Sequence, residues 1–392
     1  MKKLLFILSI CLLKSQLIYS QEAIWKFKTD GRIYSSPAQN GENVFFGSGD
    51  GFLYSLNKKT GKLNWKYKTG GAVHSSPIIS NGVVYFGSGD GKLYAIDEQK
   101  GLLKFKFSSD GEHQYDLWDY YLSSPTIEEG IVYWGSGDSS LYAIGAKSGV
   151  LIWKFATQGV VHASPVFSEG IIYIGSFDGH FYALESKTGK LLWDFNTIGD
   201  AYFPKGEVQK AALVDSGTVY FGTRDYNIYA LDTKTGTGKW NMKEPHGWII
   251  ATPTEYKGNL YYGLSDGHKF YCQDKKTGFL KWELPLNMRA YGSAVVFNDL
   301  IFFGCFNGKL YGVDYATGKV KWVFQTDGSK QNYAKVYSAD DNFSPDFKLY
   351  GQDYLKSEET IHTLGSILGT PLIDKGYIYF GSSDGNFYCV KI

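Results

Sequence analysis

A segment of about 40 residues recurs along almost the whole chain, and this repetition restricts the fold more than any other feature of the sequence. In the copy from Trp65 to Lys104, three short stretches alternate between apolar and polar residues, and Asn81-Gly82, Gly89-Asp90-Gly91 and Lys100-Gly101 follow them. Such alternation predicts β-strands, and Asn-Gly and Asp-Gly supply the positive φ angles that tight hairpins require. With a fourth strand that ends each copy, one repeat predicts a four-stranded antiparallel meander, which is the size of a propeller blade.

Two markers count the copies, and each occurs eight times. The aromatic residue of the fourth strand recurs as Trp25, Trp65, Phe105, Trp153, Trp193, Trp240, Trp282 and Trp322. The hairpin between the second and third strands begins at Gly47, Gly87, Gly135, Gly175, Gly222, Gly263, Gly304 and Gly381. The chain begins on a fourth strand, Ala23 to Thr29, and ends at Ile392 after a third strand. We therefore predict an all-β, eight-bladed β-propeller, in which the N-terminal strand completes the C-terminal blade and leaves no open sheet edge.

The residues around the repeated aromatic resemble a known motif. Three copies share its spacing, with Ala183, Glu185, Thr188, Gly189 and Trp193 in one, Asp232, Thr235, Gly236 and Trp240 in the next, and Asp274, Thr277, Gly278 and Trp282 in the third. The pattern resembles the tryptophan-docking motif of pyrroloquinoline quinone (PQQ) type eight-bladed propellers, and the resemblance covers residues 22–392. It implies that each aromatic packs between adjacent blades. That family includes quinoprotein alcohol dehydrogenases and the non-enzymatic BamB lipoproteins, which this chain resembles in size, so the resemblance implies a fold and leaves the activity open.

The first 20 residues predict a secretory signal peptide. Two lysines precede the apolar run Leu4 to Leu13, which is too short to span a bilayer, and we place cleavage after Ser20. Cys11 lies inside that run and follows Ile10 instead of a small residue, which argues against a lipid anchor. We expect an exported protein, periplasmic or extracellular, with one propeller domain over residues 21–392 and no transmembrane segment in the mature chain.

The overall composition excludes some classes of partner. The formal net charge is +1, so the chain has no general preference for nucleic acids or anionic membranes. The mature chain keeps Cys272, Cys305 and Cys389, which are widely separated and predict buried thiols without a disulfide framework. We expect a monomer.

Large insertions distinguish the copies, and all of them fall in the links from a fourth strand to the next first strand. They are the loops Asp110 to Leu122, Ile198 to Gln209 and Gly328 to Leu368, of which the last contains the long insertion 328–366. In a meander these links emerge on one face, so we predict that this face carries the function, since long aperiodic loops are usually functional or disordered. The longest insertion is rich in aromatic residues, and two roles stay open for it: a plug over the central channel or a lid that binds a partner.

The first residue of each first strand should face the channel at the same end. These positions are Tyr34, His74, Leu122, His162, Gln209, Ile250, Tyr291 and Leu368. Because His74 and His162 are two blades apart, we expect no shared metal ion between them. Lys210, Arg224 and Arg289 lie nearby and predict a locally basic mouth that attracts a carboxylate or phosphate, with scattered surface charge as the alternative. Together with Trp118, Tyr121 and Trp248, the residues Tyr34, His74, His162, Lys210, Arg224, Arg289 and Tyr291 are the candidates for ligand or partner binding.

The sequence lacks the features that a quinoprotein dehydrogenase of this family implies: an acidic calcium site, a general-base aspartate and, in the alcohol dehydrogenase branch, adjacent cysteines. The channel-facing positions hold no Asp or Glu, and the recurring aspartates, such as Asp50 and Asp90, are explained as hairpin residues. We therefore predict no catalytic residues and no cofactor. The leading hypothesis is an exported, non-catalytic PQQ-like propeller that binds an envelope protein or small ligand through the insertion-bearing face. The alternatives are a PQQ-dependent dehydrogenase with an unusual site, which would bind PQQ and calcium, and a carbohydrate-binding propeller suggested by aromatic residues.

Overall fold

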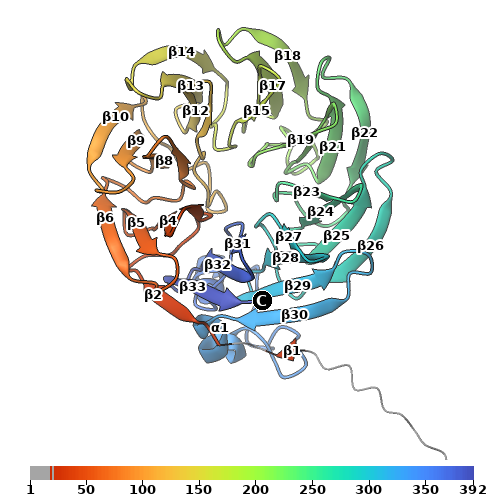
Figure 1. Ribbon diagram of the computed structural model, residues 1–392. Coiled ribbons are helices and arrows are strands. Elements are labelled where there is room, and N and C mark those ends of the chain that lie inside the picture. The colour runs from red at the N-terminus through yellow and green to blue at the C-terminus, as the bar shows by residue number, and fades with distance from the viewer. Residues whose placement is uncertain (1–17, 20–21) are drawn as a thin grey trace, which may run out of the picture.

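The computed structural model describes residues 18–19 and 22–392, and in this part of the chain the strands form eight antiparallel sheets arranged in a ring (Figure 1). Each sheet contains the four strands of one blade, which confirms the predicted eight-bladed propeller. Residues 1–17 and 20–21, on which the predicted signal peptide and its cleavage site fall, lie outside the described residues, so that interpretation stays a prediction.

The blades follow one another in chain order. The first four are β3 (Ala38–Asn40), β4 (Asn43–Gly47), β5 (Phe52–Asn57) and β6 (Leu63–Lys68); β7 (Ile78–Ser80), β8 (Val83–Ser88), β9 (Lys92–Asp97) and β10 (Leu103–Ser108); β11 (Thr126–Glu128), β12 (Ile131–Ser136), β13 (Ser140–Gly145) and β14 (Leu151–Ala156); and β15 (Val166–Ser168), β16 (Ile171–Gly175), β17 (His180–Glu185) and β18 (Leu191–Asn196). The last four are β19 (Leu213–Asp215), β20 (Thr218–Gly222), β21 (Asn227–Asp232) and β22 (Gly238–Lys243); β23 (Thr254–Tyr256), β24 (Asn259–Gly263), β25 (Lys269–Asp274) and β26 (Leu280–Pro285); β27 (Val295–Phe297), β28 (Leu300–Gly304), β29 (Lys309–Asp314) and β30 (Val320–Gln325); and β31 (Leu372–Asp374), β32 (Tyr377–Gly381), β33 (Asn386–Lys391) and β2 (Trp25–Lys28).

The ring closes through pairing of the two ends of the chain. Strand β2 pairs antiparallel with β33, with Trp25 opposite Cys389 and Lys28 opposite Asn386, as predicted (Figure 1). A further two-residue strand, β1 (Ile18–Tyr19), pairs parallel with β30 at the neighbouring blade. Strand β2 is the outer strand of the last blade, so all eight blades have four strands.

Burial follows the position of a strand within its blade. Strand β8 is buried along its whole length, whereas the outer strand β10 alternates between exposed and half-buried residues. The second and third strands are covered on both faces by neighbouring blades, so their sequences are nearly continuously apolar, as in β8 and β9, and do not show the alternation predicted from the sequence. The hairpin aspartates act as the sequence predicted: Asp90 Oδ2 accepts hydrogen bonds from the Tyr94 hydroxyl at 2.6 Å and from the Gly70 N–H at 3.0 Å.

The repeated tryptophan joins six of the blades to the next one, as the family resemblance implied. The ring of Trp153 lies against Gly189 in the next blade, where a Cβ atom would come within 2.7 Å of the indole, and its Nε1 donates to the Ser186 carbonyl oxygen at 2.8 Å. Gly189 has φ +72°, so both the turn and the close approach require glycine. We call this arrangement the tryptophan lock. It recurs at Trp25, Trp65, Trp193, Trp240 and Trp282, and Phe105 lies against Gly149 in the same way.

The longest insertion folds into helices, which the sequence did not predict. It contains α1 (Asp327–Asn332), the 3₁₀ turn η1 (Tyr333–Lys335) and α2 (Tyr354–His362), and we call residues 327–365 the cap. No helix within the described residues has the length and apolar character needed to cross a membrane. Cys272, Cys305 and Cys389 are buried free thiols, as predicted.

Candidate functional site

The three insertions meet over one end of the central channel, on the face that the sequence predicted. The first insertion contacts the cap, where Trp118 Nε1 donates to Glu358 Oε1 at 3.3 Å. It also contacts the second insertion, where the Tyr115 hydroxyl donates to Glu207 Oε1 at 3.0 Å. These contacts join the three insertions over the channel. We call the first insertion, the second insertion and the cap together the roof.

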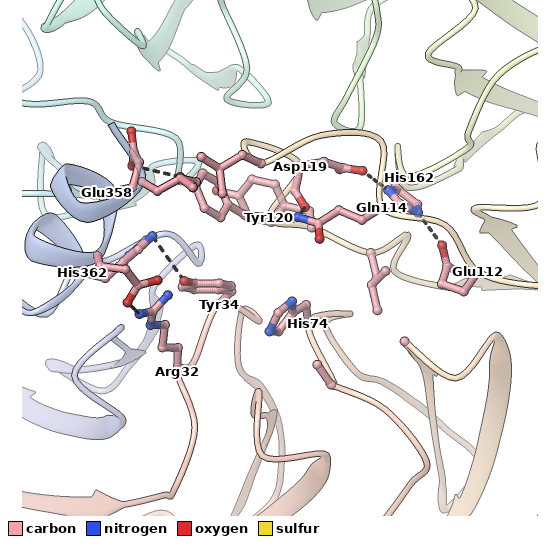
Figure 2. A pocket seen from close by; sticks show the side chains of 17 residues that line it. Arg32, Tyr34, His74, Glu112, Gln114, Asp119, Tyr120, His162, Glu358 and His362 are labelled. Carbon is pink, nitrogen blue, oxygen red and sulfur yellow. Dashed lines mark hydrogen bonds and ion pairs between the residues drawn. The ribbon is translucent and has the colours of Figure 1, made fainter. Parts of the chain in front are cut away.

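Helix α2 packs over the channel mouth, so the cap is a plug in this structure. Ile361 and Leu364 are fully buried, in one cluster with Tyr34 and Tyr291 of the propeller and Tyr120 of the first insertion. Beneath α2 lies a cavity of about 450 Å³, which we call the mouth cavity (Figure 2). The residues that line it are Arg32, Tyr34, Ala72, His74, Gly89, Glu112, Gln114, Leu117, Asp119, Tyr120, Tyr121, Leu122, His162, Leu355, Glu358, Glu359 and His362.

His162 lies between two carboxylates at one side of the mouth cavity (Figure 2). Its Nδ1 is 2.7 Å from Asp119 Oδ2 and its Nε2 is 2.6 Å from Glu112 Oε1. Burial alone would lower the pKa of His162, but the hydrogen bonds and charges of Asp119 and Glu112 outweigh burial and raise it to about 9. The imidazolium therefore fixes the first insertion to the fourth blade.

Two other histidines at the mouth are neutral. Burial and the nearby Arg32 guanidinium lower the pKa of His74 to about 4 and that of His362 to about 3. Both rings lie beside Tyr34: the centroid of His74 is 4.8 Å from the Tyr34 centroid, and His362 Nε2 is 3.4 Å from the Tyr34 hydroxyl oxygen. The structure therefore brings Tyr34 and His74 together and places His162 across the cavity from them (Figure 2).

The expected basic mouth is wrong for the two arginines, because both are buried and paired with carboxylates: Asp116 and Glu358 from the insertions and Asp266 from the hairpin between β24 and β25. Arg289 is 1% exposed and donates from Nη1 to Glu358 Oε1 at 2.7 Å and from Nε to Asp266 Oδ1 at 3.1 Å. Arg224, also 1% exposed, donates from Nη2 to Asp116 Oδ1 at 3.2 Å. Burial of an unpaired guanidinium costs several kcal/mol, so these pairs are needed for the roof to form.

The remaining predicted aromatic residues pack around these cations. The guanidinium carbon of Arg224 lies 4.5 Å from the ring centroid of Trp248, and Trp248 meets Trp118 edge to face at 6.1 Å. Tyr121 donates its hydroxyl to the Leu368 carbonyl oxygen at 3.1 Å, and Tyr291 packs against the rings of Tyr120 and Phe306. These side chains form the wall of the channel and do not present a free aromatic surface.

Lys210 differs from the two arginines. Its Nζ is 3.4 Å from the Tyr291 carbonyl oxygen and 3.9 Å from the ring centroid of Tyr121, and no carboxylate among the described residues pairs with it. Burial lowers the pKa of Lys210 to about 7. The side chain lines a second cavity of about 240 Å³ deeper in the channel, which shares Tyr34, His74 and His162 with the mouth cavity. We call this second space the channel cavity.

Sequence reasoning missed the carboxylates that organise the mouth: Glu112, Asp116, Asp119 and Glu358. They belong to insertions that have no counterpart in the other copies, so the repeat pattern assigns them no position. The one available signal was the presence of Arg224 and Arg289 at positions that face inward, since buried arginines require acidic partners.

Comparison with known proteins supports the fold and identifies a family. The family model described as outer membrane protein assembly factor BamB matches residues 19–124, 114–247 and 224–341. The chain belongs to this family. No curated protein is similar enough to this BamB-like chain to be counted as a relative.

Solved structures with the same fold include both a BamB and dehydrogenases. BamB from Moraxella catarrhalis is 15% identical, with a TM-score of 0.71 over 95% of this chain and 99% of that chain. Quinohemoprotein alcohol dehydrogenases from Pseudomonas putida and Comamonas testosteroni are 14% and 12% identical, with TM-scores of 0.71 and 0.69, each over 94% of this chain and 76% of that chain. At these identities the likeness establishes the fold alone, and it confirms the resemblance to PQQ-type propellers.

The residues at the mouth do not fit PQQ with a calcium ion. The quinone carries three carboxylates and calcium takes six to eight oxygen ligands, so the site would need free cations and free carboxylates. Lys210 is a single cation without a carboxylate partner among the described residues, whereas Arg224 and Arg289 are already paired with acidic residues, and Glu112 and Asp119 are held by His162. Within the described residues, no group of three or more His, Cys, Asp or Glu side chains is arranged to hold a metal ion.

Proposed function

We propose that this chain is a non-catalytic binding propeller of the cell envelope, which docks a partner protein on the face that carries the three insertions. The observation that carries the proposal is the roof itself: buried charge pairs hold the cap and the first insertion in fixed positions over the channel. A rigid roof that occupies the mouth suits a docking platform better than an open catalytic cleft. The predicted signal peptide and membership of the BamB family support an envelope location.

The roof presents large apolar side chains to solvent. They come from all three insertions and are Tyr115, Ile198, Tyr202, Tyr350, Tyr354 and Leu355. Tyrosine is enriched at the energetic centres of protein interfaces because it buries a large area at a low entropic cost. The concentration of these exposed side chains on the insertion-bearing face favours a protein partner at that face.

A second group of exposed apolar residues lies at the start of the outer strands, towards the opposite face. Its members are Leu63, Leu102, Leu103, Val150, Leu151, Ile152, Leu191, Leu192, Phe279 and Leu280. These residues recur at equivalent positions of several blades, as expected for part of the repeat. They provide matched controls for the proposed docking face.

The test is affinity capture from a native envelope extract, with the purified protein as bait. The paired substitution Tyr202→Glu and Leu355→Glu places charges on the roof at residues that are 82% and 56% exposed. The control pair, Phe279→Glu and Leu102→Glu, places charges on the repeated band at residues that are 75% and 61% exposed. We expect the roof variant to lose the captured protein and the control variant to retain it, with both folded by circular dichroism.

Loss of capture only in the control variant would place the docking surface on the opposite face. Turnover of an alcohol or sugar by the purified protein, measured with an artificial electron acceptor after addition of PQQ and calcium, would contradict the non-catalytic part of the proposal.

A further inference from the structure

One blade departs from the repeat at the position where its first strand begins. The residue two before the proline slot is small in every other blade: Ser35, Ser75, Ser123, Ala163, Ala251, Gly292 and Gly369. In the fifth blade this position is Lys210, followed by Ala211 where the other blades carry Ser or Thr. A lysine in a slot that otherwise accepts only small residues must send its side chain elsewhere, and here it enters the channel cavity.

Serine and threonine hydroxyl groups line much of the rest of the channel cavity. The residue that follows each small residue forms a ring around the channel: Ser36, Ser76, Ser124, Ser164, Thr252, Ser293 and Thr370, with Ala211 as the single exception. Neighbouring blades are linked within this ring, because the Ser36 N–H donates to Ser76 Oγ at 2.8 Å and the Ser76 N–H donates to Ser124 Oγ at 2.9 Å.

Four consecutive serine hydroxyls are therefore available as donors. Ser36, Ser76, Ser124 and Ser164 each accept a backbone N–H through Oγ, from Thr370, Ser36, Ser76 and Ser124 respectively. Within the described residues none of these four hydroxyls donates a hydrogen bond, so their protons are free to point into the cavity. Together with the Lys210 amine they form a set of donors without a matching acceptor.

We propose that the channel cavity binds a small oxyanion group, the carboxylate or phosphate of a ligand, between the Lys210 ammonium and the ring of serine hydroxyls. An oxyanion supplies the acceptors that these donors lack and the counter-charge that Lys210 lacks. The cavity volume of about 240 Å³ is sufficient for such a group, and the shared lining residues allow the rest of the ligand to extend into the mouth cavity. The site is separate from the docking face proposed above.

The protonation of Lys210 should change when the anion binds. Burial lowers the pKa of its amine to about 7, and an adjacent negative charge reverses that effect. The other titratable groups that face the channel cavity are the neutral His74, the phenols Tyr34 and Tyr121, and His162, whose imidazolium is already paired with two carboxylates. At pH 8, binding of an anion should therefore take up close to one proton at Lys210.

The experiment is isothermal titration calorimetry of the purified protein with sodium acetate and, separately, inorganic phosphate. We expect saturable binding of at least one anion, an affinity at least about tenfold weaker in Lys210→Met, and a several-fold loss in Ser124→Ala. Acetate titrations at pH 8 in buffers of different ionisation enthalpy should show proton uptake that is absent in Lys210→Met. Lys100→Met, which removes an exposed lysine on a turn, should behave as wild type.

A second measurement uses only the wild-type protein, in case Lys210→Met does not fold. At pH 8, acetate or phosphate should protect the Lys210 amine from a small acylating reagent and leave Lys100 unprotected, as measured by mass spectrometry. Preference for acetate assigns a carboxylate ligand, and preference for phosphate assigns a phosphorylated one. Absence of saturable binding by both anions, or equal binding by wild type and a folded Lys210→Met, overturns the proposal, as does acylation of Lys210 without protection.

Discussion

The two faces of the propeller are held together by different interactions. On the face of the short turns, adjacent blades are joined by the tryptophan lock, in which an indole packs on a glycine and donates to a carbonyl oxygen. The insertion-bearing face also has charges buried between segments that occur once in the chain, such as Arg289 with Glu358. The first kind of contact repeats with the sequence, and the second does not.

This difference separates what builds the ring from what distinguishes this protein from other propellers. A neutral hydrogen bond, such as that of the tryptophan lock, contributes about 1 kcal/mol to stability, and its loss affects one of several equivalent contacts between blades. Loss of one partner of a buried ion pair costs about 3 to 5 kcal/mol, because the remaining charge has no partner. We therefore expect the loss of a single polar contact to have a larger effect on the insertion-bearing face than at the tryptophan lock.

The largest expected effect follows from removal of the acid that anchors the cap. Glu358→Ala leaves the buried Arg289 without its closest carboxylate and also removes an acceptor for Trp118 and Tyr120. We expect a loss of about 3 to 5 kcal/mol in the free energy of unfolding, measured by urea denaturation.

The adjacent residue provides the control. Glu359 belongs to the same helix but pairs with Arg32 at the surface, where its side chain is 66% exposed, so Glu359→Ala should cost less than about 1 kcal/mol. Equal losses for the two variants would show that the helix contributes as a whole and that the buried pair has no special role.

A second prediction concerns the pH dependence of stability, to which the buried His162 and the partly buried Lys210 contribute with opposite signs. The folded-state pKa of His162 is raised to about 9, so its stabilising contribution is fully present below pH 6.5 and is lost as pH rises through 9. The pKa of Lys210 is lowered to about 7, so its amine destabilises the fold at low pH, and this cost disappears as pH rises from about 7 to 10.5. Between pH 7 and 9 the two slopes oppose each other.

Variants should separate the two contributions. In Lys210→Met the free energy of unfolding should fall with pH between about 6.5 and 9, with a slope on the order of 1.4 kcal/mol per pH unit. In His162→Gln it should rise with pH above about 7 with a slope of similar size. His180→Gln, which removes a histidine at the surface, controls for the substitution itself. Identical pH profiles for all three variants would contradict both assignments.

The ring could be predicted from the sequence because its contacts are local or periodic. Short apolar strands, hairpin glycines and the repeated aromatic of the fourth strand recur in every copy, so the blade count does not depend on any one copy. Closure by β2 followed from counting strands. The helices of the cap were missed because their apolar residues, such as Ile361, are buried against the propeller and not against a partner within the same segment.

The candidate site was predicted only in part, for the same reason. The channel-facing positions of Tyr34, His74 and His162 follow from the repeat, and the structure places all three at the two cavities. Their partners come from unique segments: Asp119 is 43 residues from His162, and Glu358 is 69 residues from Arg289. The repeat assigns no register to such residues, so the arginines were expected at an open basic mouth and are instead buried in neutral pairs.

The smallest expected effect tests whether all tryptophans at blade junctions are equivalent. Trp322 faces the blade formed by both chain ends, which has no glycine turn between its third and fourth strands, and its buried Nε1 has no hydrogen-bond partner within the described residues. Trp153→Phe removes the hydrogen bond to Ser186, whereas Trp322→Phe removes a polar group that had no acceptor. Both lose apolar contact, so we expect Trp153→Phe to cost about 1 kcal/mol more than Trp322→Phe in urea denaturation. Phe105 already occupies this position at another junction, so both variants should fold. A larger cost for Trp322→Phe than for Trp153→Phe would mean that the Trp322 indole has a hydrogen-bond partner at the junction with the last blade.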